Sequence, residues 1–436
     1  MKNLATFLTI AVVLALVAQQ ALGQFVWTKN AQNPMFSGGA VGSWNREVIC
    51  GCVLFNTDSS RYEMWFNASA GTSSDWTPLS VGFASSKDGV NWTMSTTAVL
   101  SPTPGTWDAY TVEAPWVIRE NGEYKMWYTS YLGYSPWLGY LGYATSPDGI
   151  HWTKYSGNPV MGPGAAAWEN DGPYTCAVMP FAEGYQMWYG AYPLASGGPS
   201  IGYATSPDGI AWQRDTVHNP VLQYGGAGQW DGGWVLFPRV HQIGNTYYMW
   251  YEGRESAGST LTYHRMTGVA TSTDMGITWT KFAGNPVLSP SAGTWDATRA
   301  SVGSVLQRGD TLDMWYTGGD ATNLVRIGHA TSLIDTVTGA VDEGSGNVPK
   351  EFVLAQNYPN PFNPTTTIRY ALTEQSRVTL AVFNTLGQQV ATLVEGEMEA
   401  GHHEVTFDAS SLASGVYLYR LTAGEHVQAR KLVLLR

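Results

Sequence analysis

The chain has 436 residues, about two or three domains' worth, and its 44% apolar residues are enough for a large core, which excludes wholesale disorder. Its formal net charge of −11 argues against nucleic acids and anionic lipid surfaces as partners, because both attract clustered cations. The 19 Trp, 24 Tyr and 49 Gly favour many short strands joined by tight turns over helical bundles.

The N-terminus has the pattern of a secretory signal peptide. A basic start at Lys2 is followed by an apolar run over 4–17 and by the small-residue cleavage site Ala21-Leu22-Gly23. No later apolar stretch approaches the ~20 residues that span a bilayer. We therefore expect residues 1–23 to be removed from an exported protein that has no transmembrane segment.

An internal repeat, built on the triplet Met-Trp-aromatic, is the strongest pattern in the chain. The triplet tryptophans are spaced by 62, 61, 62 and 65 residues, and each triplet is preceded by another Trp about 20 residues earlier. The triplets are Met64-Trp65-Phe66, Met126-Trp127-Tyr128, Met187-Trp188-Tyr189, Met249-Trp250-Tyr251 and Met314-Trp315-Tyr316. Five copies of one unit explain this spacing.

Each unit contains four short β-like runs, which in the second unit lie at about 112–118, 124–130, 138–145 and 151–155. The first four units end on a turn of the Ser-Pro-Asp-Gly type, followed by one more Trp. Four strands in each repeated unit predict an all-β fold, a five-bladed β-propeller.

The fifth unit lacks its last strand, and the start of the mature chain supplies a candidate for it. Trp27-Thr28-Lys29, followed by Asn33-Pro34, matches Trp152-Thr153-Lys154, followed by Asn158-Pro159. We therefore expect the N-terminal segment to close the ring as the outer strand of the last blade, which protects an open edge.

Composition changes near residue 335, after which there is no Trp. The tail alternates apolar and polar residues, as in 377–382 and 415–419, which predicts a small Ig-like β-sandwich. Four motifs, 356–364, Leu386-Gly387-Gln388, Gly415-Val416-Tyr417 and 431–434, strongly resemble the type A sorting domain of type IX secretion. That resemblance implies the type IX secretion machinery as a partner and a location at the bacterial cell surface or outside the cell, after export through the periplasm.

The predicted organisation is therefore a signal peptide over 1–23, a propeller over 24–334, a linker over 335–351 and a sorting domain over 352–436. The oligomeric state is left open. Cys50, Cys52 and Cys176 have no companion spacing for zinc, and Cys50 and Cys52 would lie about 6.5 Å apart along a strand. We expect all three to be buried as small apolar residues.

The repeats around Met-Trp-Tyr and Ser-Pro-Asp-Gly-Ile-x-Trp resemble the five-bladed propellers of glycoside hydrolase families 43, 32 and 130, over about residues 25–333. The aspartate turns also resemble the Asp box of sialidases, which lies away from the catalytic centre. We therefore interpret the turn aspartates as structural; they are Asp88, Asp148, Asp208 and Asp274.

The repeat provides an internal control, since charged residues that occur in one blade only need a reason beyond the blade itself. The acid after the first Trp of a unit occurs in four units, so we interpret it as a cap at the start of a strand; these acids are Asp108, Glu169, Asp231 and Asp296. Glu47, Glu113 and Asp171 are unrepeated acids on the predicted inner strands and are the candidate catalytic residues. Arg239, Arg299 and His241 are unrepeated bases and are candidate substrate-binding residues.

Three carboxylates converging on a central funnel would suit glycoside hydrolysis, in which a neutral acid protonates the leaving oxygen and a carboxylate attacks the sugar or activates water. The resembling families use Asp, Asp and Glu in blades one to three, where this chain has Glu47, Glu113 and Asp171. Glu113-Ala114-Pro115 looks like their Glu-x-Pro strand, one blade early. The alternative is that a buried Glu pairs with Arg239 or Arg299 and plugs the channel.

Trp116, Trp137 and Trp234 do not repeat and are candidates for stacking on sugars, with loop packing as the alternative. No metal or phosphate-binding motif occurs, although the resemblance leaves room for a calcium ion in the channel. The sequence thus indicates a secreted glycan-active protein, for which we favour glycosidic bond cleavage by a funnel carboxylate pair. The alternatives are a non-catalytic carbohydrate-binding or surface-interaction propeller, and a glycoside phosphorylase in which Arg239 and Arg299 hold phosphate.

Overall fold

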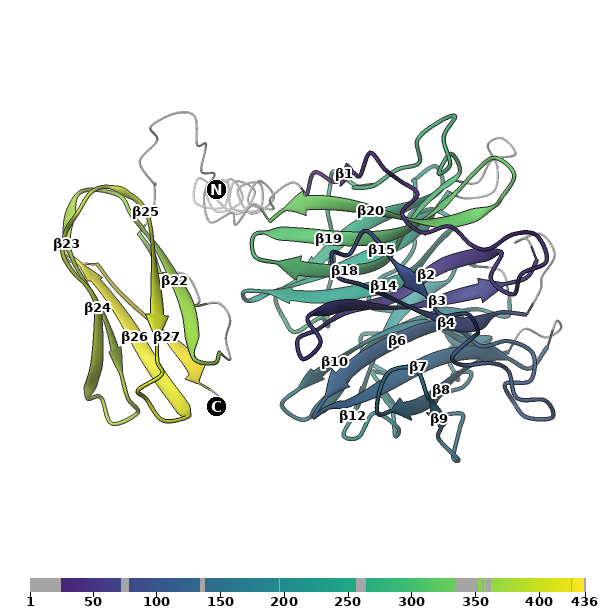
Figure 1. The fold of residues 1–436 in the computed structure, drawn as a ribbon, viewed down its shortest axis with the longest axis horizontal. Helices are drawn as coiled ribbons and strands as arrows, with labels where there is room; N and C mark the ends of the chain where they lie inside the picture. Colours follow the sequence, from purple (N-terminus) through teal and green to yellow (C-terminus); the bar gives the residue numbers. More distant parts are fainter. Residues whose placement is uncertain are drawn as a thin grey trace, which may run out of the picture. The chain divides into compact units, whose positions relative to one another are not determined.

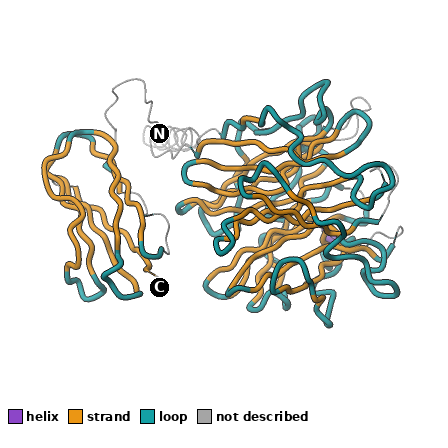
Figure 2. The backbone as a smooth tube through the Cα atoms, viewed as in Figure 1, coloured by secondary structure: helices purple, strands orange, loops and turns teal. Residues whose placement is uncertain are grey.

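The computed structural model of the protein describes residues 25–71, 78–133, 138–195, 197–255, 264–334, 352–354, 357, 362–424 and 426–434. The chain divides into two compact units, Gln24–Ile334 on the one hand and Met1–Gly23 with Asp335–Arg436 on the other. Strands and loops make up nearly all of the described backbone (Figure 2). The signal peptide and the linker predicted from the sequence lie outside the described residues.

The larger unit is built from five antiparallel blades, as the repeat predicted (Figure 1). Blade one contains β2 (Glu47–Asn56), β3 (Arg61–Ser69), β4 (Ser80–Ser86) and β5 (Thr93–Met94). Blade two contains β6 (Glu113–Glu120), β7 (Glu123–Tyr131), β8 (Gly139–Ser146) and β9 (Thr153–Lys154). Blade three contains β10 (Gly172–Phe181), β11 (Gly184–Tyr192), β12 (Ser200–Ser206) and β13 (Gln213–Arg214), preceded by the short helical turn η1 (Ala167–Glu169).

Blade four contains β14 (Trp234–Ile243), β15 (Thr246–Arg254), β16 (Arg265–Ser272) and β17 (Thr280–Lys281). Blade five contains β18 (Arg299–Arg308), β19 (Thr311–Gly319) and β20 (Val325–Leu333), to which β1 (Thr28–Lys29) adds as the outer strand. The first strands of the blades contact one another in a cycle that β18 closes on β2, so they form the inner wall of a ring. The structure therefore confirms a five-bladed propeller closed by an N-terminal strand.

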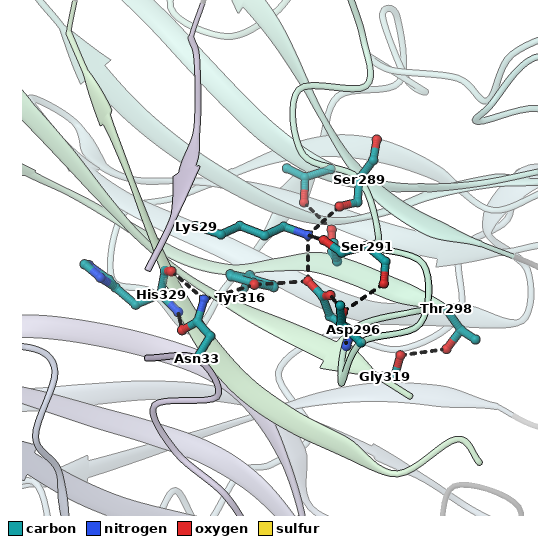
Figure 3. A network of polar contacts seen from close by, with 12 residues as sticks. Lys29, Asn33, Ser289, Ser291, Asp296, Thr298, Tyr316, Gly319 and His329 are labelled. Carbon is teal, nitrogen blue, oxygen red and sulfur yellow. Dashed lines mark hydrogen bonds and ion pairs between the residues drawn. The ribbon is translucent and has the colours of Figure 1, made fainter. Parts of the chain in front are cut away.

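Ring closure rests on polar contacts as well as on strand pairing (Figure 3). Lys29 on β1 donates hydrogen bonds to Asp296 at 2.6 Å and to Ser291 at 2.8 Å. Asn33 donates to the hydroxyl of Tyr316 at 3.2 Å and accepts from the backbone N–H of His329 at 2.8 Å. The N-terminal segment thus makes in blade five the contacts that a continuous chain makes in blades two to four.

Those contacts correct the interpretation of the repeated acids as caps at the start of a strand. In blade two Asp108 forms an ion pair with Lys154 of the outer strand at 2.5 Å and accepts a hydrogen bond from Tyr128 at 3.2 Å. Glu169, Asp231 and Asp296 have the same two kinds of partner in the other three blades. The acid therefore fastens the outer strand to the triplet tyrosine.

The triplet tryptophans join neighbouring blades. Trp65 donates its indole N–H to the carbonyl of Gly149, in the turn of the next blade, at 2.8 Å, and three other triplet tryptophans do the same. Trp250 faces blade five, which lacks that turn, and its indole nitrogen has no hydrogen-bond partner among the described residues. Phe25 and Trp27 pack against its ring instead, at 5.5 and 6.3 Å between centroids.

The turn aspartates are structural, as predicted. Asp88 accepts hydrogen bonds from the backbone N–H groups of Val90 and Asn91 at 2.9 and 2.7 Å. These bonds hold the pKa of Asp88 well below its ordinary value. The three cysteines are buried and free, in agreement with the sequence prediction, and burial raises the pKa of each thiol.

The tail forms two sheets, as an Ig-like sandwich requires. One contains β21 (Val353–Leu354), β22 (Thr365–Leu372) and β25 (Gly401–Asp408); the other contains β24 (Gln389–Met398), β23 (Ser376–Phe383), β26 (Gly415–Ala423) and β27 (His426–Leu434). Side chains from both sheets build a core that includes Ile368, Leu380 and Tyr419. Within the described part of the chain, no helix has the length and apolar character needed to cross a bilayer.

Candidate functional site

The inner strands carry a bulge in every blade, and two of these bulges hold unusual residues. The register of β6 shifts between Glu113 and Trp116, and that of β14 shifts between Leu236 and Arg239. Ala114 and Phe237, within these bulges, have φ of 50° and 52°, a left-handed conformation that side chains disfavour. Such strain persists where the surroundings impose it and is common at functional sites.

Glu113 stands immediately before the strained residue of blade two, where a neighbouring blade fixes the backbone. The N–H of Ala114 donates to the amide oxygen of Asn67, in blade one, at 2.8 Å. Glu113 itself is 7% exposed, and burial raises its pKa to about 8. A carboxyl group of this kind is protonated at neutral pH and can donate a proton.

Asp171 lies immediately before β10, in blade three. Its backbone N–H donates to the carbonyl of Tyr192, and its own carbonyl accepts from Gly139 of blade two. Its side chain is half-buried, with Oδ1 lacking a hydrogen-bond partner among the described residues. Burial raises the pKa of Asp171 to about 6, so this carboxyl group is mostly ionised at neutral pH.

Glu47, the third predicted carboxylate, opens β2 opposite Ser69 and is 3% exposed. Like Trp234 in blade four and Arg299 in blade five, it pairs with the residue that lies four positions after the triplet tryptophan. Glu113 lies opposite Thr129, two residues further along the inner strand than the position of Glu47. Leu236 and Ser301 are its equivalents in blades four and five. Glu47 and Glu113 therefore lie at two different levels of the inner wall, and Asp171 lies just before the level of Glu47.

Arg239 fills the ring deeper along the inner strands. It donates hydrogen bonds to the backbone carbonyls of Gly303, in blade five, and of Cys176, in blade three. Its guanidinium also lies 5.4 Å from the ring centroid of Trp116. Carbonyls and an aromatic ring thus hold Arg239 in the channel, whereas the pairing of a buried glutamate with an arginine, the alternative considered from the sequence, occurs at Arg299 with Glu252.

Trp116 contributes to this packing and not to an open surface. Its indole N–H donates to the carbonyl of Val178 at 2.8 Å, and its ring packs with the core between blades. We therefore leave Trp116 and Arg239 out of the candidate substrate contacts. The alignment of the repeats selected them because a residue that fills the centre of the propeller occurs in one blade only, as does a residue that binds a ligand.

Arg299 is paired inside the protein as well. It donates to Glu252, in blade four, at 3.0 Å and to Ser301 at 2.9 Å. Glu252 is fully buried; burial opposes its ionisation, but Arg299 and Arg265 hold its pKa below the ordinary value. Glu252 is an unrepeated acid that the alignment of the five repeats missed. The unrepeated charges were sought on the first strand of each blade, whereas Glu252 follows the triplet on the second strand.

Beside this pair lies a row of three residues that face one another in register, Trp234, Arg254 and Arg265. The guanidinium carbons of Arg254 and Arg265 are 4.3 and 5.0 Å from the ring centroid of Trp234. Tyr174 and Tyr192, in blade three, lie within electrostatic reach of both Glu113 and Arg265.

His241 does not join this cluster. His241 lies opposite Tyr248, farther along β14, and hydrogen-bonds Gln307, while burial lowers its pKa. Trp137 lies outside the described residues. Among the described residues no group of three or more His, Cys, Asp or Glu side chains is arranged to hold a metal ion.

Comparison with known families identifies the tail. Residues 356–435 match the family model of the secretion system C-terminal sorting domain. The tail is therefore a sorting domain of type IX secretion, and the protein is directed to the cell surface or released. Two uncharacterized proteins from two strains of Mycobacterium tuberculosis are each 29% identical over 151 residues, which is 34% of this chain and 48% of theirs. The chain thus spans about half the length of these curated relatives.

Solved structures identify the propeller fold. A glycoside hydrolase superposes with a TM-score of 0.56 at 20% identity, covering 69% of this chain and 91% of its own. A β-1,2-mannobiose phosphorylase from Listeria innocua superposes with a TM-score of 0.54 at 14% identity, covering 71% of this chain and 97% of its own. At these identities the likeness extends to the fold.

Proposed function

We propose that the protein is a secreted glycan-active enzyme that hydrolyses glycosidic bonds at the inner wall of the propeller. The observation that carries the proposal is Glu113, an acid that is buried on a bulge with a strained neighbour and whose pKa burial raises to about 8. An acid that stays neutral at pH 7 is what protonation of a departing sugar oxygen needs.

Asp171 is the proposed ionised partner. Its pKa of about 6 leaves it mostly charged at the pH at which Glu113 is mostly neutral. Two carboxyl groups whose surroundings separate their pKa values can divide the roles of acid and of nucleophile or base. Glu47, at the same end of the inner strands, remains a third candidate, with a role in binding the sugar ring.

The test is hydrolysis of a panel of plant and microbial oligosaccharides by the mature protein. Glu113→Gln and Asp171→Asn are expected to lose at least a hundredfold in kcat/KM, because general acid catalysis contributes about 10²–10⁴-fold. Asp58→Asn serves as the control, since Asp58 is an exposed acid paired with Arg119. Activity that survives in both Glu113→Gln and Asp171→Asn would refute the assignment.

One observation favours a carbohydrate-binding protein without catalysis, namely that Glu113 is only 7% exposed. In that case glycans bind, but no member of the panel is cleaved. The phosphorylase alternative needs Arg239 and Arg299 to hold phosphate. Arg239 instead donates to the carbonyl of Gly303 and Arg299 to Glu252, which argues against that alternative. Phosphate is accordingly expected to leave the rate of cleavage unchanged.

A further inference from the structure

We propose that Arg265 and Arg254, positioned by Trp234, bind the carboxylate of a hexuronate sugar, so that the protein acts on acidic glycans. This inference rests on the proposed function for its location, since Trp234 and the candidate catalytic acid Glu113 lie toward the same end of the inner strands. It goes further by naming the substrate class.

The first reason is the charge at this place. Arg265 lies 3.8 Å from Glu252, but Glu252 is already bound by Arg299 at 3.0 Å, so two guanidiniums share one carboxylate. Arg265 is also 36% exposed at its side chain, whereas that of Arg299 is 10% exposed. Among the described residues, no other carboxylate forms an ion pair with Arg265, so its carboxylate partner is shared with Arg299 and its charge is accessible, in a chain whose net charge is −11.

The second reason is preorganisation. Arg254 and Arg265 are partners across β15 and β16, and the indole of Trp234 holds both guanidiniums. A fixed planar fork binds a carboxylate through two parallel hydrogen bonds, and little side-chain entropy remains to be lost.

The third reason is the register of the row relative to Glu113. Trp234 lies two residues before Leu236, and Leu236 occupies in blade four the position that Glu113 occupies in blade two, so both lie toward the same end of the inner strands. The ring of Trp234 is occupied by the two guanidiniums, so Trp234 acts as a positioning residue here rather than as a platform for a sugar.

The experiment measures binding by calorimetry to the mature Glu113→Gln protein, which the proposed function makes inactive. The probes are oligosaccharides of galacturonate, glucuronate and mannuronate, the same oligosaccharides with methyl-esterified carboxyls, and inorganic phosphate. Arg265→Gln and Arg265→Lys are compared with Arg326→Gln, whose arginine is also partly exposed and paired with Asp320. Thermal melting checks that each variant is folded.

At least one hexuronate oligosaccharide is expected to bind. Its affinity should fall at least tenfold on methyl esterification and at least tenfold in Arg265→Gln, less in Arg265→Lys, and should stay unchanged in Arg326→Gln. Equal binding of the esterified probe, unchanged binding in Arg265→Gln, or binding of phosphate without any hexuronate would each overturn the inference.

The two proposals fail separately. Binding of a hexuronate oligosaccharide that the wild-type protein never cleaves overturns the hydrolase and leaves the binding site. Cleavage of neutral glycans that depends on Glu113 but is the same in Arg265→Gln overturns the hexuronate site and leaves the hydrolase.

Discussion

Single residues of the propeller differ in how their charge is compensated. Asp108 and Asp296 are as buried as Glu113, yet each forms an ion pair with a lysine. Burial is the cause of the raised pKa of Glu113 and of Asp171. This difference separates acids that hold the blade together as ion pairs from acids whose pKa lies near neutral pH.

The pH dependence of cleavage follows from these two carboxyl groups. The reaction needs Asp171 ionised, which fails below about pH 6, and Glu113 protonated, which fails above about pH 8. We therefore expect kcat/KM to follow a bell with its maximum near pH 7. A rate that rises steadily to pH 9 would contradict the roles assigned to Glu113 and Asp171.

Glu113 should also make folding depend on pH. Its folded-state pKa of about 8 exceeds the ordinary 4.5, so the native state binds more protons than the unfolded state between these values, and stability falls as pH rises. The loss amounts to roughly 3 kcal/mol at pH 7, at about 1.4 kcal/mol for each pH unit. Glu113→Gln stays neutral, so in urea unfolding it should be more stable than wild type at pH 8.

Near pH 4 the same variant and the wild type should be equally stable, because Glu113 is then protonated in both states. Asp148→Asn provides a contrast of opposite sign. Hydrogen bonds hold the pKa of Asp148 below its ordinary value, so its contribution is present at neutral pH and is lost on acidification. A Glu113→Gln variant that is less stable than wild type at pH 8 would contradict the raised pKa.

At the scale of the strand, the acid, cation and tyrosine form one unit that is present or absent together. Four blades have it, and blade one has Asn45, Met94 and Phe66 in the corresponding places, with Asn45 contacting the sulfur of Met94. The sequence itself shows that all three residues of the unit are replaced together in blade one. The repeated acids looked like caps because their tyrosine lies 20 positions away and their cation about 50 positions away, or 267 positions away for Asp296 and Lys29.

Ring closure by β1 leads to a comparison of two lysines. Lys29 and Lys154 are each 23% exposed and each pair with an aspartate that is 1% exposed. Lys29→Met and Lys154→Met should each cost about 2 kcal/mol of stability, because an aspartate is left buried without its cation. Hydrogen exchange should rise in β20 for the first variant and in β8 for the second. Unchanged exchange in β20 would show that closure does not depend on Lys29.

At the scale of the whole molecule, the propeller and the tail have separate cores. The core of the tail contains only residues after 350, and the cores between blades contain only residues before 335. Deletion of 350–436 should therefore leave the thermal midpoint and the cleavage activity of the propeller unchanged. The truncated protein should accumulate in the periplasm, which cell fractionation measures. A propeller that fails to fold without the tail would contradict two independent units.

The sequence by itself determined the blade number, the closing strand and the sorting tail, because a repeat encodes the same local structure five times and each departure from it can be counted. It also identified Glu113 and Asp171 as unrepeated acids. Only the tertiary structure decided what the unrepeated residues contact. Arg239 and Trp116 turned inward to fill the ring, whereas Glu252, Arg254 and Arg265 came together from β15 and β16. Partners of Arg239, Trp116 and Arg299 lie in other blades, more than 40 positions away along the chain, which no local pattern records.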